Sequence, residues 1–206
     1  MFASAVSAQE FTTQEKSVTG VFEVPGKKKS EIFSAVNKWI SVNYNSANAV
    51  TQLSDAEAGT IVIKGINSIN VRTNGKVLYP NAPNNPEFYE VKFDHIIEIN
   101  VKDERFRVIY KIVGIHNPTH QDQLATDVVF GALSLDGVKD ENIEIYKKYV
   151  RSQNPTNKIL TKENLEAYLD LAKPTMQESS ESLERSMKDT MDKIYNSFKQ
   201  QEKDKW

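Results

Sequence analysis

The residues best suited to chemistry in this chain are its three histidines, at positions 95, 116 and 120. His116 and His120 are four positions apart, a spacing that brings two imidazoles to one face of a helix and so suits a zinc site. Pro118 lies between them and disfavours such a helix. We therefore expect two loop histidines in water, with no metal and no cofactor.

His95 falls on the apolar parity of a strand pattern, which admits two interpretations. It is either a buried base with a depressed pKa or a core histidine with one satisfied nitrogen. The nearby carboxylates of Asp94 and Glu98 have the opposite strand parity and point to the other face, so they do not share a cleft with His95. No stretch resembles a nucleophile elbow. The sequence therefore predicts a protein that is not an enzyme.

Composition and charge exclude several classes of protein. The chain has 206 residues, with 26 Lys and Arg against 28 Asp and Glu and a formal net charge of −2, which provides no field to hold a nucleic acid. The lack of cysteine excludes disulfides, thiolate nucleophiles, zinc fingers and iron–sulfur clusters. No apolar run reaches the roughly 18 residues of a membrane span.

The first eight residues read MFASAVSA, and Val6-Ser7-Ala8 before Gln9 fits the small-x-small pattern accepted by signal peptidase. We expect residues 1–8 to be the residual tail of an export signal, and the protein to work in the periplasm or outside the cell. A frayed N-terminus of small residues is the alternative.

Hydrophobic periodicity predicts the elements that position these side chains. The first elements are a strand over 18–24 and a helix from an N-cap at Ser30 to about Tyr44, which buries Trp39. Strands over 49–53 and 60–65 follow, and the second of them extends to 71 after a bulge at Gly65. Residues 72–87 are rich in proline and asparagine and are expected to form a loop.

The clearest pattern lies between positions 89 and 112. Seven alternate residues predict a long half-buried strand: Tyr89, Val91, Phe93, His95, Ile97, Ile99 and Val101. After a polar connection over 102–105, the residues Phe106, Val108, Tyr110 and Ile112 alternate again. This arrangement predicts an antiparallel hairpin with one face in water.

The C-terminal part is expected to be an irregular connection over 116–160 with a short helix over 143–153, and then a helical segment over 161–206. Thr161 is a suitable N-cap for a helix that ends before Pro174. A longer helix follows, with an apolar stripe formed by Met176, Leu183, Met187, Met191, Ile194, Tyr195 and Phe198. At about 1.5 Å per residue this helix is roughly 45 Å long, more than the sheet needs. We expect its second half, around Ile194 and Phe198, to protrude or to contact a partner.

This element order predicts an α+β fold, in which a curved antiparallel sheet of order β-α-β-β-β-β carries helices on one face and ends in a long C-terminal helix. Residues 20–65 and 90–113 resemble a bacterial secreted domain family of unknown function with a TBP-like fold. The features that carry the resemblance are the strand over 21–24, Trp39 with Ile40, the segment 57–61, Lys102-Asp103, and the strand over 105–108. The resemblance covers residues 18–115 and implies a fold related in shape to helix-grip domains, with no assigned chemistry and no DNA binding.

We therefore expect a non-enzymatic exported domain that binds an unknown protein or holds a small apolar ligand between sheet and helix. The candidate ligand residues are Val91, Phe93, His95, Ile97, Phe106, Val108 and Tyr110, closed by Leu183 and Met187. The alternative is a structural module with a filled core, in which the long helix serves self-association as a homodimer.

Overall fold

The computed structural model describes residues 9–79, 81, 86–117, 122–154 and 161–203. The expected processing site at Val6–Ala8 and the histidine at position 120 lie outside these residues, so export stays a prediction. No helix within the described ranges is both long and apolar enough to cross a membrane.

A sheet of six antiparallel strands forms the centre of the fold, in the order β1-β2-β6-β5-β4-β3. The strands are β1 (Gln9–Gln14), β2 (Ser17–Glu23), β3 (Thr51–Asp55), β4 (Thr60–Arg72), β5 (Phe88–Lys102) and β6 (Arg105–Ile115). The helices are α1 (Lys29–Asn43), α2 (Ala47–Val50), α3 (Asn74–Leu78), α4 (Gln123–Ala132), α5 (Asp140–Gln153), α6 (Lys162–Asp170) and α7 (Ala172–Lys203). Most predicted elements are present, and the α+β prediction is confirmed.

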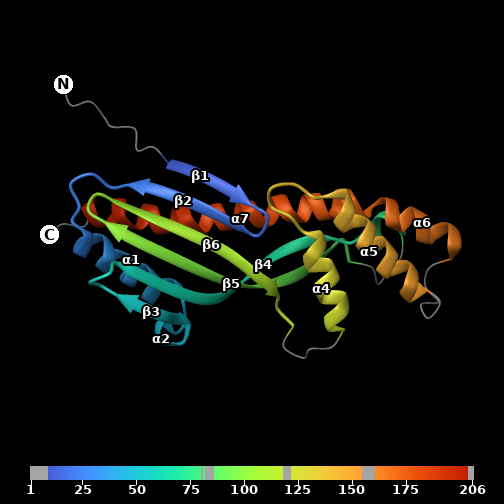
Figure 1. The fold of residues 1–206 in the computed structure, drawn as a ribbon, viewed down its shortest axis with the longest axis horizontal. Helices are drawn as coiled ribbons and strands as arrows, with labels where there is room; N and C mark the ends of the chain where they lie inside the picture. Colours follow the sequence, from blue (N-terminus) through green and yellow to red (C-terminus); the bar gives the residue numbers. More distant parts are fainter. Residues whose placement is uncertain (1–8, 80, 82–85, 118–121, 155–160, 204–206) are drawn as a thin grey trace, which may run out of the picture.

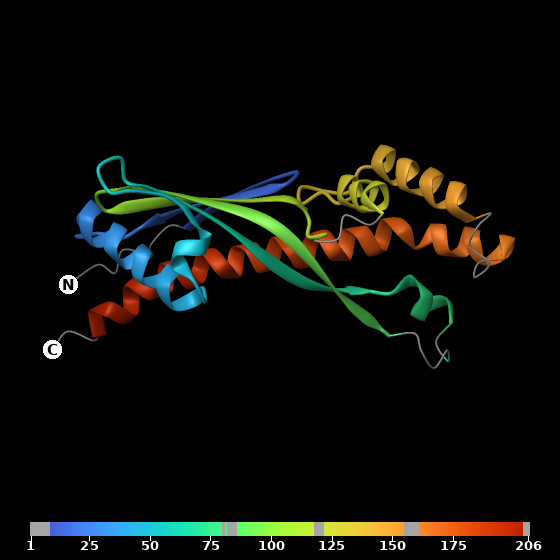
Figure 2. The same ribbon diagram turned by 90° about the horizontal axis from the view of Figure 1, so that it is seen from below.

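Helices α1 and α7 cover one face of the sheet, while the opposite face is open to solvent (Figures 1 and 2). The predicted alternation in β5 determines which face is covered, because Phe93, His95, Ile97, Ile99 and Val101 are all buried. The hairpin of β5 and β6 is antiparallel as predicted. Trp39 of α1 is buried against the same core, also as predicted.

The second half of helix α7 packs on the sheet, contrary to the prediction. Ile194 and Phe198, expected to be exposed, are 0% and 5% exposed. Their half of the helix packs on an aromatic floor, where the ring of Tyr195 lies 5.5 Å from that of Phe22 and the ring of Phe198 lies 5.1 Å from that of Phe106. The first half of α7 instead extends beyond most of the sheet, and α7 contacts α5 and α6 (Figure 1). The expectation of an exposed second half is therefore wrong.

Two differences lie near the N-terminus. Strand β1 was not predicted because its sequence, QEFTTQ, has no apolar alternation. It is held by pairing with β2 and by Phe11, whose ring contacts Phe22 edge-on. Helix α1 begins at Lys29 and not after Ser30, because two carboxylates accept the first N–H groups: Glu31 accepts that of Lys28 at 2.8 Å, and Asp103 in the β5–β6 turn accepts that of Lys29 at 2.7 Å. A tertiary contact thus adds to the local cap of this helix.

Further along the chain, two short helices occupy segments expected to be irregular. Helix α3 lies within the loop over 72–87, and α4 lies within the connection over 116–160. The N-cap at Thr161 is confirmed, since its hydroxyl accepts the Asn164 N–H. The predicted break between the two C-terminal helices at Pro174 is wrong, because α6 ends before Leu171. Pro174 lies in the first turn of α7, where a missing N–H removes no helical hydrogen bond.

The predicted bulge at Gly65 is absent, and the actual bulge is on the neighbouring ladder. Pairing of β4 with β5 runs without a shift through Gly65 and His95, whereas the pairing of β5 with β6 shifts between Asp94 and His95. A Cβ atom on residue 65 would lie 2.8 Å from Nε2 of His95 and 3.2 Å from the ring of Tyr44. Glycine at this position therefore makes room for the imidazole.

We predict that Gly65→Ala lowers the free energy of unfolding by about 1 to 3 kcal/mol, because the added methyl overlaps the buried imidazole. Gly114→Ala is the matched control on β6, since a Cβ there would have no neighbour within 4 Å. Urea denaturation of both variants measures the difference. Equal stabilities of the two variants would contradict the close packing of Gly65 on His95.

Candidate functional site

His95, the candidate base, lies in the core beneath α7 and is 3% exposed. Its Nδ1 is 3.2 Å from the hydroxyl of Tyr110, and its Nε2 has no hydrogen-bond partner among the described residues. Burial lowers the pKa of His95 to about 4, against the opposing effect of Asp94. The imidazole is therefore neutral at physiological pH and belongs to the core.

The carboxylates near His95 in sequence lie on the other face of the sheet. Oδ1 of Asp94 is 2.8 Å from Nδ1 of His116, at a partly exposed position. The Glu98 carboxylate accepts a hydrogen bond from the amide of Asn100. His95 thus shares no cleft with either carboxylate, and no cluster of metal-binding side chains occurs among the residues described.

The centre of the space between sheet and helix is filled by side chains. Of the nine residues expected to contact a ligand, seven are core residues that do not line the cavity between the sheet and the C-terminal helices: His95, Ile97, Phe106, Val108, Tyr110, Leu183 and Met187. Val91 and Phe93 line that cavity, near one end of β5, and Phe106 borders a separate one beside Arg105 and Arg107. The candidate site is therefore displaced along the sheet from the predicted position.

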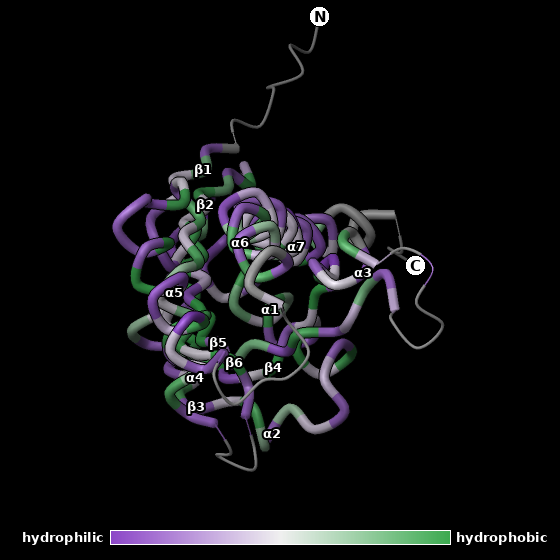
Figure 3. Tube along the Cα trace, turned by 90° about the vertical axis from the view of Figure 1, so that its right-hand side faces the viewer, coloured by the Kyte–Doolittle hydropathy of each residue, from purple (hydrophilic) through white to green (hydrophobic). Residues whose placement is uncertain are grey.

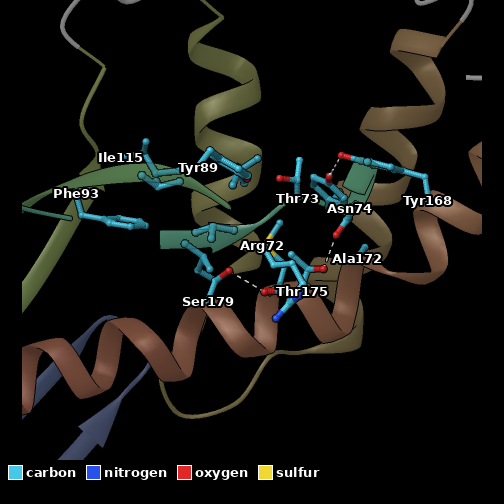
Figure 4. A pocket seen from close by; sticks show the side chains of 17 residues that line it. Arg72, Thr73, Asn74, Tyr89, Phe93, Ile115, Tyr168, Ala172, Thr175 and Ser179 are labelled. Atoms are coloured by element: carbon cyan, nitrogen blue, oxygen red, sulfur yellow. Dashed lines mark hydrogen bonds between the residues drawn. The ribbon is translucent and has the colours of Figure 1, made fainter. Parts of the chain in front are cut away.

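This cavity has a volume of about 270 Å³ and lies between the distal ends of β4 and β5 and the C-terminal helices (Figure 4). Its lining comprises Val71, Arg72, Thr73, Asn74, Gly75, Tyr89, Val91, Phe93, Ile115, Val129, Leu133, Tyr146, Tyr168, Ala172, Thr175, Met176 and Ser179. Figure 3, a view along the long axis of the molecule, shows α3 and α5 on opposite sides of α7. Figure 2 shows the same arrangement from below.

The twist of the sheet explains why a space opens at this end. Strands β4 and β5, of 13 and 15 residues, sweep across α7 toward α3 (Figure 2). A twisted sheet diverges from a straight helix along its length, so α7 alone does not cover the distal strands. Helices α4, α5 and α6 supply the missing walls, including Val129, Leu133, Tyr146 and Tyr168.

Three tyrosines bring their hydroxyls to one part of the cavity wall. The Tyr146 and Tyr168 hydroxyls are 3.4 Å apart, and Tyr89 interacts electrostatically with both residues. Burial raises the pKa of Tyr146 and of Tyr89 above the ordinary value, so both are neutral phenols at physiological pH. Another part of the wall is apolar, with Phe93, Leu133 and Met176 all buried.

Polar side chains on α3 and α7 form a second part of the wall. The Thr175 hydroxyl donates to Oδ1 of the buried Asn74 at 2.5 Å, and the Ser179 hydroxyl donates to the Thr175 carbonyl at 2.7 Å. The Arg72 guanidinium lies 3.1 Å from Glu87 and 3.6 Å from Glu178. The arrangement can hold a small molecule that is mostly apolar and polar at one point.

Sequence reasoning missed most of this wall. Tyr146 lies on the apolar stripe of α5 and is buried as that stripe predicts. Tyr89 continues the apolar parity of β5 but is 48% exposed at the end of the strand. Nothing in the sequence placed Tyr168 near either of them, because their contact depends on how α5 and α6 pack on α7.

Comparisons with known proteins bear on the fold. Residues 19–112 match the family described as a domain of unknown function (DUF4468) with TBP-like fold. A crystal structure of a DUF4468 family protein from Bacteroides ovatus ATCC 8483 is 16% identical with a TM-score of 0.39, over 50% of this chain and 57% of that one. A TBP-like protein from Parabacteroides distasonis ATCC 8503 is 16% identical with a TM-score of 0.42, over 87% of this chain and 92% of that one. Among curated proteins none matches.

We predict that His95 makes the fold sensitive to acid. In the unfolded chain a histidine takes up its proton below about pH 6.5, whereas in the folded protein the pKa of His95 is about 4. Between these values the unfolded state binds more protons, so stability falls as the pH falls. From pH 7 to pH 5 the wild type should lose about 2 kcal/mol more than His95→Gln.

Denaturant unfolding at the two pH values measures this loss. His116→Gln serves as the control, because His116 is partly exposed on the other face of the sheet and its removal should leave the loss in place. If the wild type and His95→Gln lose the same free energy of unfolding between pH 7 and pH 5, His95 is not buried as a neutral group.

Proposed function

Since residues 19–112 belong to the DUF4468 family, whose description specifies a TBP-like fold and no activity, we propose a function from the cavity itself. The protein is a non-enzymatic binding domain that holds a small, largely apolar molecule between the distal end of its sheet and its C-terminal helices. The observation that carries this proposal is the cavity of about 270 Å³ lined by Val91, Phe93 and Met176.

The composition of the wall supports a ligand. Small-molecule sites are concave and mostly apolar with a few polar groups, and a volume of about 300 Å³ is at their lower end. Empty apolar space also lowers stability, because the surrounding atoms lose packing contacts there. Polar groups confined to part of the wall would orient the bound molecule.

The self-association alternative has less support. It needs an exposed apolar strip on the long helix, but Leu183, Met187, Met191, Ile194 and Phe198 are all buried within the same chain. The described part of α7 therefore offers no apolar strip on this side to a second copy.

The methionines allow a direct test by NMR. With methionine methyl groups labelled with ¹³C, we expect ethylbenzene to shift the Met176 signal, because Met176 lines the cavity. Met187 and Met191 lie further along α7 in the filled core and are each 0% exposed, so their signals should stay in place.

Two valine variants supply the control for this titration. Val91→Phe places a ring in the cavity and should abolish the Met176 shift. Val113→Phe makes the same change at a position on β6 that is 45% exposed and outside the cavity lining, and it should bind as the wild type does. Absence of any Met176 shift in the wild type, or an undiminished shift in Val91→Phe, would refute the proposed site.

A further inference from the structure

The hydrogen bonds around the cavity indicate what polar group its ligand carries. The Tyr146 and Tyr168 hydroxyls are 3.4 Å apart, from α5 and α6 (Figure 4 labels Tyr168). Each hydroxyl has one proton to donate, and a bond between the two uses one of these protons. Among the described residues neither hydroxyl has another hydrogen-bond partner, so the pair retains one donor.

The aliphatic hydroxyls of the lining already donate within the protein. Thr73 donates to the Pro86 carbonyl, Thr175 to Oδ1 of Asn74, and Ser179 to the Thr175 carbonyl. The Oδ1 of Asn74 accepts from Thr175, and the NH₂ group of the same amide supplies two donors. The polar wall therefore complements a hydrogen-bond acceptor in the ligand.

Charge at the rim of the cavity favours a neutral acceptor. Arg72, the one charged residue of the lining, lies close to two carboxylates, those of Glu87 and Glu178. The three groups together carry a net negative charge, which would repel an anionic ligand. Burial raises the pKa of Tyr146, so its phenol stays protonated and able to donate.

We infer that the ligand is a small neutral carbonyl compound, such as a ketone, aldehyde or ester with an aromatic or branched apolar body. Its carbonyl oxygen accepts a hydrogen bond from the Tyr146 and Tyr168 pair, while its apolar body lies against Phe93 and Met176. This inference rests on the proposed function, since it names the class of molecule that the same cavity takes.

Matched ligands and tyrosine variants test the inference. The probes are acetophenone and ethylbenzene, which differ in the carbonyl oxygen, with the Met176 methyl signal as the readout. Because either hydroxyl alone could still donate, the variant is the double substitution Tyr146→Phe with Tyr168→Phe. It should weaken acetophenone binding by about tenfold and change ethylbenzene binding by less than about twofold.

Tyr149→Phe is the matched control on α5, because Tyr149 does not line the cavity and should leave both affinities unchanged. Unchanged Met187 and Met191 signals show that the double variant is folded. An equal effect of the double variant on both probes, or benzoate binding more tightly than acetophenone, would overturn the carbonyl assignment while leaving the proposed function in place. A wild type whose Met176 signal responds to neither probe would overturn both.

Discussion

Burial of the apolar stripe of α7 on the covered face of the sheet is the interaction on which the rest of the structure depends. Helix α7 contacts β2, β4, α1, α5 and α6, and thus joins the sheet to the C-terminal helices. Each large apolar side chain that it buries contributes about 1.5 to 3 kcal/mol. The stripe includes Leu183, Met187, Met191 and Ile194, each 0% exposed, so its removal would expose the inner faces of β2 and β4.

The same helix creates the cavity, because a straight helix and a twisted sheet cannot remain in contact along their full lengths. Over β2 and β6 the gap is closed by aromatic packing, with Tyr195 of α7 at 5.5 Å from Phe22 and Phe198 at 5.1 Å from Phe106. At the distal ends of β4 and β5 the gap is wider, and α4, α5 and α6 close it only in part. The part of the chain that matches the family supplies one wall of this space, and residues beyond it supply the other. A ligand specificity built on Tyr146 and Tyr168 would therefore not be a property of the family domain alone.

His95 shows how a polar group is accommodated in the filled part of the core. Its ring faces Gly65 on one neighbouring strand and lies near Tyr110 on the other, with ring centroids 4.8 Å apart. The tyrosine hydroxyl satisfies one nitrogen, the glycine leaves space for the other, and the bulge beside Asp94 locally shifts the β5–β6 register. The arrangement explains a buried histidine without assigning it catalysis.

The sequence by itself determined the type of the long elements and which of their residues share an apolar face. Alternation over residues 89–101 predicted the covered face of β5, which the structure shows from Phe93 onward, whereas Tyr89 is exposed. The helical spacing from Met176 to Phe198 predicted a single apolar side of α7, because period and parity follow from backbone geometry alone. Only the tertiary structure decided what covers each face. A periodic pattern shows that a side chain is buried but does not identify what it packs against. Contacts between segments far apart in the chain decided three features: the burial of Phe198 on Phe106, the contact of Asp103 with the start of α1, and the contact of Tyr146 with Tyr168. The cavity belongs to this second group, since it arises from the divergence of two elements and leaves no mark in the sequence of either.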